Sequence, residues 1–112
     1  MRLKQEKFYK QCVLNGKEYA VECVGEPHEV DGILFYVNRV INGIGWIVTV
    51  GKTGMRIGTV YGSRKRAIDA LPLLATEAKA IIERAPDIMD VMGAYLKNLE
   101  RITEEDYKKL FR

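Results

Sequence analysis

Two Asn-Gly dipeptides, at residues 15–16 and 42–43, constrain the fold of this chain more than any other feature of its sequence. Each one lies between runs in which apolar and polar residues alternate. Asn-Gly between such runs is the strongest short-range signal for a β-hairpin, because both residues tolerate the positive φ angles of a tight turn. The sequence therefore predicts two antiparallel hairpins in the first half of the chain.

The second hairpin specifies its own register. A two-residue turn there pairs 33–41 with 44–50, and a further turn returns the chain as a third strand over 55–61. With this pairing one face of the meander collects the apolar residues Ile33, Phe35, Val37, Ile41, Ile44, Trp46, Val48, Val50, Met55 and Ile57. A slip of one residue would turn them to the other face, so we expect a well-specified register in which Trp46 lies opposite Thr59.

The first hairpin places both cysteines on one face of the sheet. Its turn puts Cys12 opposite Tyr19 and Cys23 opposite Phe8. The two sulfur atoms are then about 13 Å apart along the strands, at ~3.3 Å per residue. A disulfide needs Cα atoms within about 7 Å, so we expect two reduced, buried thiols with a structural role rather than a redox or metal-binding one.

The Gly-Glu-Pro-His segment at 25–28 is predicted to end the second strand in a loop. His28 is the only histidine of the chain, and carboxylates surround it. A zinc site commonly takes three or four ligands from His and Cys, so a solvated loop is the favoured interpretation. Without a second histidine the chain offers no His-based nucleophile triad, and we expect a protein that is not an enzyme and has no cofactor.

Residues after 62 have helical periodicity. Ser63 is a predicted N-cap, and Pro72 is expected to kink or split the helix that follows. Pro86-Asp87 is predicted to end that helix and begin another, and Thr103 to cap a short last one.

Strands followed by helices indicate the α+β class. The 112 residues correspond to one domain. Residues 1–62 are expected to form an antiparallel sheet of about five strands, and 63–112 two or three helices packed on one face of it. The longest apolar runs are far shorter than the ~20 residues of a membrane span, and no secretory signal is visible. We therefore expect a cytoplasmic protein with no membrane partner.

The formal charge of +3 is spread almost evenly along the chain, but one local arrangement is unusual. Arg64, Lys65 and Arg66 occupy the first turn of a predicted helix, where each cation opposes the helix dipole by about 0.3–1 kcal/mol. One explanation is an anion bound there by free backbone donors together with these side chains. The other is a tolerated cluster on a solvated helix start. Lys52 and Arg56, from the adjoining hairpin, could extend such a patch.

The second face of the meander is more apolar than a solvated face should be. It carries Leu34, Tyr36, Val40, Ile47 and Val60. The first hairpin, a helix, a second copy of the chain or a nucleic-acid strand stacked on Tyr36 would each account for this composition. Self-burial or dimerisation is the favoured pair of explanations.

The function predicted from these signals is non-enzymatic nucleic-acid binding, possible ligands including single-stranded DNA. The predicted phosphate contacts are Arg64, Lys65, Arg66, Lys52 and Arg56, and Tyr36 is predicted to stack on a base. The order of elements, sheet followed by helices, is similar to that of single-stranded-DNA-binding coactivator domains, which dimerise through their helices. This likeness is one of element order, without a shared motif.

The alternative is a protein–protein interaction or self-assembly protein, such as a homodimer or an accessory subunit of a larger complex. Met89, Met92 and Tyr95 form one helical stripe, and these residue types suit adaptable interfaces. A third class is an enzyme or ligand-binding protein whose site forms only between subunits.

Overall fold

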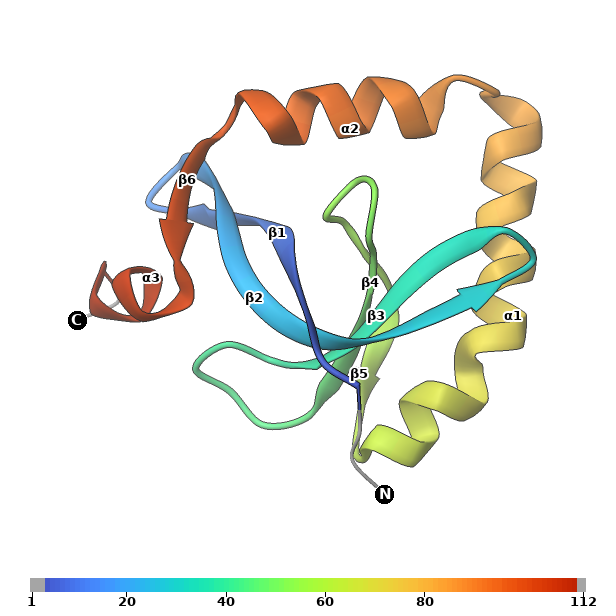
Figure 1. Ribbon diagram of the computed structural model, residues 1–112, viewed down its shortest axis with the longest axis horizontal. Helices are drawn as coiled ribbons and strands as arrows, with labels where there is room; N and C mark the ends of the chain where they lie inside the picture. Colours follow the sequence, from blue (N-terminus) through green and yellow to red (C-terminus); the bar gives the residue numbers. More distant parts are fainter. Residues whose placement is uncertain (1–3, 111–112) are drawn as a thin grey trace.

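The computed structural model describes residues 4–110, which form an antiparallel sheet of five strands, a sixth strand and three helices (Figure 1). The strands are β1 (Glu6–Leu14), β2 (Lys17–Val30), β3 (Ile33–Arg39), β4 (Trp46–Val50), β5 (Arg56–Tyr61) and β6 (Glu100–Thr103). The helices are α1 (Arg64–Arg84), α2 (Ile88–Asn98) and α3 (Glu104–Leu110). The predicted α+β class is confirmed. Within residues 4–110, no helix has both the length and the apolar character needed to cross a membrane.

The first hairpin has the predicted turn and register. Asn15 and Gly16 have φ angles of 52° and 79°, as a two-residue turn of the I′ type requires. Cys12 lies opposite Tyr19, and Phe8 lies opposite Cys23. Both thiols are free, that of Cys23 buried and that of Cys12 half-buried.

The second hairpin has the predicted register but not the predicted turn. Phe35 pairs with Val50 and Arg39 with Trp46, as expected. Regular pairing stops at Arg39, however, and a wider loop over 40–45 replaces the two-residue turn. The prediction that Ile44 lies on the core face is wrong, because its side chain is 97% exposed at the tip of this loop.

The pairing of β4 with β5 begins as predicted and then shifts. Val48 lies opposite Ile57, but Trp46 lies opposite Tyr61 instead of Thr59. The extra residues on β5 form a bulge that includes Gly58, whose φ of 81° suits glycine. Period-two alternation cannot reveal such an insertion, since a bulge changes the pairing and not the residue types.

β2 does not end at 25–28, and the prediction of a loop there is wrong. It is one 14-residue strand that pairs with β1 up to Gly25 and with β3 from Glu26 onward. A Cβ on Gly25 would lie 2.8 Å from the Phe8 ring, so only glycine leaves room for β2 at the point where it changes from pairing with β1 to pairing with β3. Pro27 lies beyond the last pair between β2 and β1, so β1 needs no backbone N–H from this position and proline is tolerated there. His28 is therefore a half-buried strand residue, not part of a solvated loop.

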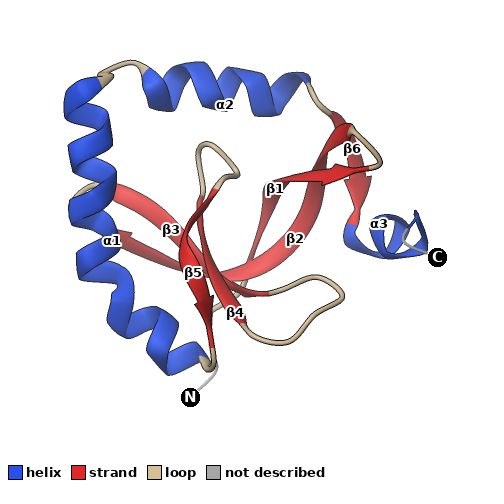
Figure 2. Ribbon diagram, turned by 180° about the vertical axis from the view of Figure 1, so that it is seen from behind, coloured by secondary structure: helices blue, strands red, loops and turns tan. Residues whose placement is uncertain are grey.

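Helix α1 covers the first face of the meander. The hydrophobic core between them is formed by residues of the sheet and of one side of α1. The sheet contributes Ile33, Phe35, Val37, Val48 and Val50, and the helix contributes Ala67, Leu71, Leu74, Ala75 and Ala78. The predicted cap is confirmed, since the Ser63 side chain accepts a hydrogen bond from the backbone N–H of Arg66 at 3.2 Å. α1 continues through Pro72 as one helix, and Figure 2 shows it bent in its first half.

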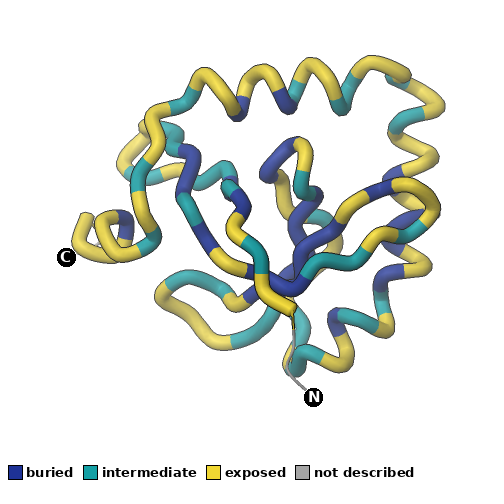
Figure 3. Tube along the Cα trace, in the orientation of Figure 1, coloured by how far each residue is buried: buried dark blue, intermediate teal, exposed yellow. Residues whose placement is uncertain are grey.

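The second face is covered largely from within the chain by the first hairpin and α3. The Phe8 and Tyr36 rings stack with centroids 4.4 Å apart, and Tyr107 of α3 belongs to the same cluster. Leu34 and Val60 of this face stay exposed. Figure 3 shows the buried residues concentrated in the central strands, whereas α2 is mostly exposed. Self-burial therefore accounts for most of the apolar second face.

β6 was not anticipated from the sequence. It pairs in parallel with the first half of β2, with Arg101 opposite Ala20 and Thr103 opposite Glu22. Thr103 also caps α3 as predicted, because its hydroxyl accepts from the backbone N–H of Asp106 at 3.1 Å. This strand fixes the far end of α2, which spans the distance between α1 and β6 (Figure 1).

Candidate nucleic-acid interface

A cleft of about 400 Å³ lies between α2, the β1–β2 hairpin and the turn that joins β4 to β5. Four of the residues that line it are exposed cations: Lys7, Lys52, Lys97 and Arg101. The described residues of its lining include no carboxylate, and they contribute the rings of Phe8, Tyr9 and Tyr36. We call this feature the basic cleft.

Close backbone contact positions α2 over the cleft. Gly93 and Leu96 are the buried residues of this helix. A Cβ on Gly93 would lie 3.1 Å from the backbone oxygen of Lys52, and Leu96 packs against Gly54, whose own Cβ would meet it at 2.9 Å. Glycine in mid-helix is unfavourable by about 1 kcal/mol relative to alanine, so here it serves the close approach. α2 therefore lies directly on the β4–β5 turn and carries Lys97 to the cleft.

Two of the four cations have carboxylate partners outside the cleft lining. Lys52 contacts Asp90 of α2, and the hydrogen bond from Lys52 lowers the pKa of Asp90. Lys7 lies 3.5 Å from Glu22 across the β1–β2 ladder. The side chains of Lys7, Lys52 and Asp90 are well exposed, and that of Glu22 is 35% exposed. Ion pairs that water reaches in this way contribute roughly 0–1 kcal/mol, so a phosphate can replace either carboxylate at low cost.

The other two cations, Lys97 and Arg101, are more available to contact a phosphate or a base. Lys97 has no ion-pair partner among residues 4–110. The Arg101 guanidinium lies over the Tyr9 ring, 4.8 Å from its centroid. A guanidinium plane held by an aromatic ring is a surface on which an unpaired base can stack.

Tyr36 lines the basic cleft, but its ring is buried. It is 7% exposed and stacked on Phe8 with an interplanar angle of 5°. Its hydroxyl donates to Glu6 at 3.3 Å, and burial raises the pKa of Tyr36. Tyr36 therefore lies in the floor of the cleft, and Phe8 covers one face of its ring.

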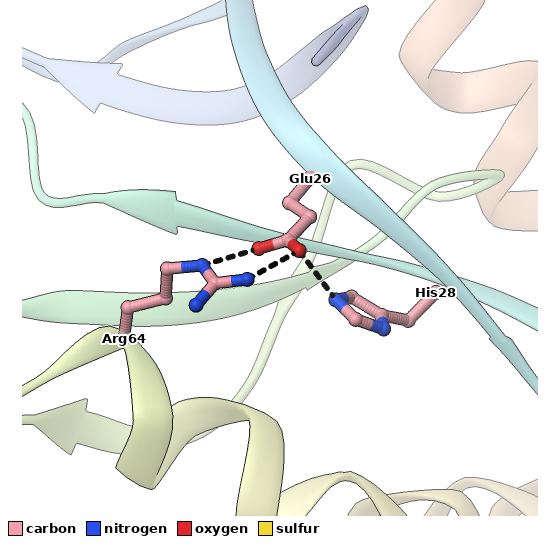
Figure 4. Close-up of polar contacts among 3 residues, drawn as sticks. All are labelled: Glu26, His28 and Arg64. Atoms are coloured by element: carbon pink, nitrogen blue, oxygen red, sulfur yellow. Dashed lines mark hydrogen bonds and ion pairs between the residues drawn. The ribbon is translucent and has the colours of Figure 1, made fainter. Parts of the chain in front are cut away.

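At the start of α1, a carboxylate on β2 balances one of the three cations (Figure 4). Arg64 donates two hydrogen bonds to Glu26, each 2.6 Å long, and the Glu26 side chain is 11% exposed. These bonds lower the pKa of Glu26. His28 Nε2 lies 3.5 Å from the same carboxylate. Glu26 thus explains Arg64 without a bound anion.

The remaining predicted residues lie apart from the basic cleft. Lys65 is exposed and 3.5 Å from Asp69 one turn along the helix, and the Arg66 side chain is also exposed. Arg56 is an exposed residue at the first position of β5. β5 has six residues and separates the Lys52 turn from the start of α1 by about 20 Å at ~3.3 Å per residue. Of the six predicted residues, the structure brings only Lys52 and Tyr36 together in the cleft.

Sequence reasoning missed Lys7, Lys97 and Arg101, because the parallel pairing of β6 with β2 is what brings Arg101 to β1. One available signal was Tyr9, which with Val13 is an exception on the face of the first hairpin that carries Lys7, Gln11, Glu18 and Glu22. Among residues 4–110, no group of three or more His, Cys, Asp or Glu side chains is placed to hold a metal ion. Comparisons with protein-family models, with curated proteins and with solved structures find no match to this chain.

Proposed function

We propose that this protein is a non-enzymatic, cytoplasmic module that binds single-stranded nucleic acid in the basic cleft. The observation that carries the proposal is the composition of that cleft: four exposed cations, three aromatic rings and no carboxylate among its described lining residues. Proteins that bind single strands combine a positively charged groove with rings on which bases stack.

The geometry favours a single strand over a duplex. The four cations come from β1, the β4–β5 turn, α2 and β6, so they surround the opening instead of lying along one helix. A cleft of about 400 Å³ can take an unpaired base, whereas a paired base is enclosed by its own helix. Arg101, held over Tyr9, is the group on which we expect the base to stack.

The test is the binding of a fluorescently labelled oligothymidylate, measured by anisotropy at several salt concentrations. For single strands each neutralised phosphate contributes about −0.7 to the slope of log affinity against log salt, so four contacts predict a slope of about −3. The double variant Lys97→Gln/Arg101→Gln should make that slope shallower by about 1.4 and weaken binding at least tenfold. Lys79→Gln is the matched control, because Lys79 is an exposed cation on α1 that pairs with Asp31 at 2.9 Å.

Three outcomes would overturn the proposal: no binding, binding without salt dependence, or unchanged affinity in the double variant. A separate variant, Lys65→Gln/Arg66→Gln, tests the start of α1. If it alone abolishes binding, the site is the helix start and not the basic cleft. Arg64 is left unchanged in these tests, since its substitution disturbs the ion pair with Glu26.

A second candidate function is self-association through an apolar groove between α1, α2 and the β4–β5 turn. The groove has a volume of about 250 Å³ and includes Met55, Ile81, Met89 and Met92, of which Met55 is 44% and Ile81 49% exposed. An exposed methionine of the turn, an exposed isoleucine of α1 and two half-buried methionines of α2 favour an adaptable interface. Light scattering at high protein concentration tests it, and a strict monomer removes this candidate.

A further inference from the structure

A buried lysine lies between the first hairpin and the second face of the meander, apart from the basic cleft. Lys10 is 5% exposed, and its Nζ donates to the backbone oxygen of Arg39 at 3.1 Å. No carboxylate of residues 4–110 is within ion-pair distance of it. An ammonium has three hydrogens to donate, and a neutral amine has two, so donor capacity remains in either state. Burial lowers the pKa of Lys10 and outweighs the opposing effects of Cys23, Cys12 and Glu104, which raise it.

Asn38 supplies an unused acceptor beside the same space. Its Nδ2 donates to the backbone oxygen of Tyr36 at 2.9 Å and to Thr49 Oγ1 at 3.1 Å, which fixes the orientation of the amide. Its Oδ1 is buried and has no hydrogen-bond partner among the described residues. Asn38 is only 3% exposed, and orphaned acceptors at such depth are uncommon in folded proteins.

Lys10 and Asn38 both line one cavity of about 320 Å³. Arg39 and Trp46 form part of its wall, with the guanidinium 5.0 Å from the centre of the indole ring. Ligand sites have volumes of about 300–1,000 Å³, so this cavity suits a ligand with one ring. The cavity therefore combines a buried donor, a buried acceptor and an indole in its wall, and the carboxylate of Glu104 also lines it.

We propose that this cavity binds a small planar ligand in which a carbonyl oxygen adjoins an N–H, as in the cyclic amide edge of uracil. The carbonyl accepts from Lys10 Nζ, and the ring N–H donates to Asn38 Oδ1. A carboxylate offers acceptors alone and leaves Asn38 Oδ1 unpaired, whereas an alkylammonium ion offers donors alone and cannot accept from Lys10. The cyclic amide satisfies both groups at once. This site is independent of single-strand binding in the basic cleft, so the failure of either proposal leaves the other intact.

The test uses a pair of ligands that differ by one donor. 1-Methyluracil keeps the ring N–H, and 1,3-dimethyluracil carries a methyl group in its place. Trp46 is the single tryptophan of the chain, so its fluorescence reports on the wall of this cavity. We expect a saturable change with 1-methyluracil and at least tenfold weaker binding of 1,3-dimethyluracil, because a site with a buried unpaired acceptor rejects the analogue that lacks the donor.

Lys10→Met provides a second, independent readout. Methionine is close to lysine in length and removes the donor without adding bulk, so affinity for 1-methyluracil should fall at least tenfold. Lys17→Met, on an exposed lysine of the same hairpin, should leave it unchanged. Equal affinity for the two ligands, or no saturable binding by the wild-type protein, would overturn the proposal. The two-ligand comparison needs no variant and holds even if Lys10→Met does not fold.

Discussion

The substitution Arg64→Met tests whether the ion pair with Glu26 holds the start of α1 against β2. Glu26 accepts two bonds of 2.6 Å from Arg64, and its side chain is 11% exposed against 34% for Arg64. Removing one partner of a buried ion pair costs about 3–5 kcal/mol, because the other charge stays buried and unpaired. Arg64 is about a third exposed, so water screens its charge in part. We therefore expect the free energy of unfolding to fall by only about 2–3 kcal/mol, which is comparable to the loss of one or two hydrogen bonds to a charged group.

Urea denaturation followed by circular dichroism measures this loss. Lys65→Met is the matched control, because it removes a neighbouring cation whose contact with Asp69 is exposed and contributes roughly 0–0.5 kcal/mol. The double variant Glu26→Gln/Arg64→Met should be less destabilised than Arg64→Met, since a neutral amide is easier to leave unpaired than a carboxylate. If Arg64→Met loses no more stability than Lys65→Met, the ion pair does not hold this helix start and Arg64 is free to serve the anion site first predicted for it.

Three further predictions concern the pH dependence of Glu26, the packing of Gly25 and the reactivity of the two cysteines. The pKa of Glu26 is lowered in the folded protein, so its carboxylate stabilises the fold above the ordinary pKa of a glutamate. This stabilisation is lost as the pH falls through the lowered pKa. Glu26→Gln should therefore make the free energy of unfolding depend less on pH in the acid range. A flat acid limb in the wild-type protein would contradict this. Gly25→Ala places a Cβ 2.8 Å from the Phe8 ring and should destabilise the fold by about 1–3 kcal/mol in thermal unfolding, whereas an unchanged melting temperature would show that the layers can separate freely. Burial raises the pKa of Cys23 to about 12, so a thiol reagent at neutral pH should label Cys12 first and Cys23 only as the protein opens; equal rates would refute the buried position of Cys23.

The parts of the fold that the sequence predicted are those fixed by neighbouring residues. Asn15-Gly16 sets the turn and hence the register of β1 with β2. Ser63 and Thr103 each cap a helix through the N–H of the third residue beyond. In each case the interacting groups are a few residues apart, so local geometry alone determines the outcome.

The parts that were mispredicted depend on distant residues. Gly25 and Pro27 are typical of a loop, but here the strand changes partners between them, and only the positions of β1 and β3 make that possible. The bulge at Gly58 is likewise invisible to alternation. Arg64 and Glu26 are 38 residues apart, so a cation that looks misplaced within its helix is neutralised by a strand from the other half of the chain.

The same reasoning changes the interpretation of the net charge. The charge is spread almost evenly along the sequence, so the sequence predicts a binding patch only where three cations are neighbours, at Arg64, Lys65 and Arg66. The basic cleft shows why that inference is incomplete. Its four cations, Lys7, Lys52, Lys97 and Arg101, come from well-separated parts of the chain. They meet only because the β1–β2 hairpin forms, α2 packs on the β4–β5 turn and β6 pairs with β2. Such a cluster should lose its charge density when α2 is displaced. Gly93→Val, which forces a branched side chain toward the Lys52 carbonyl, should therefore weaken single-strand binding without removing a single cation.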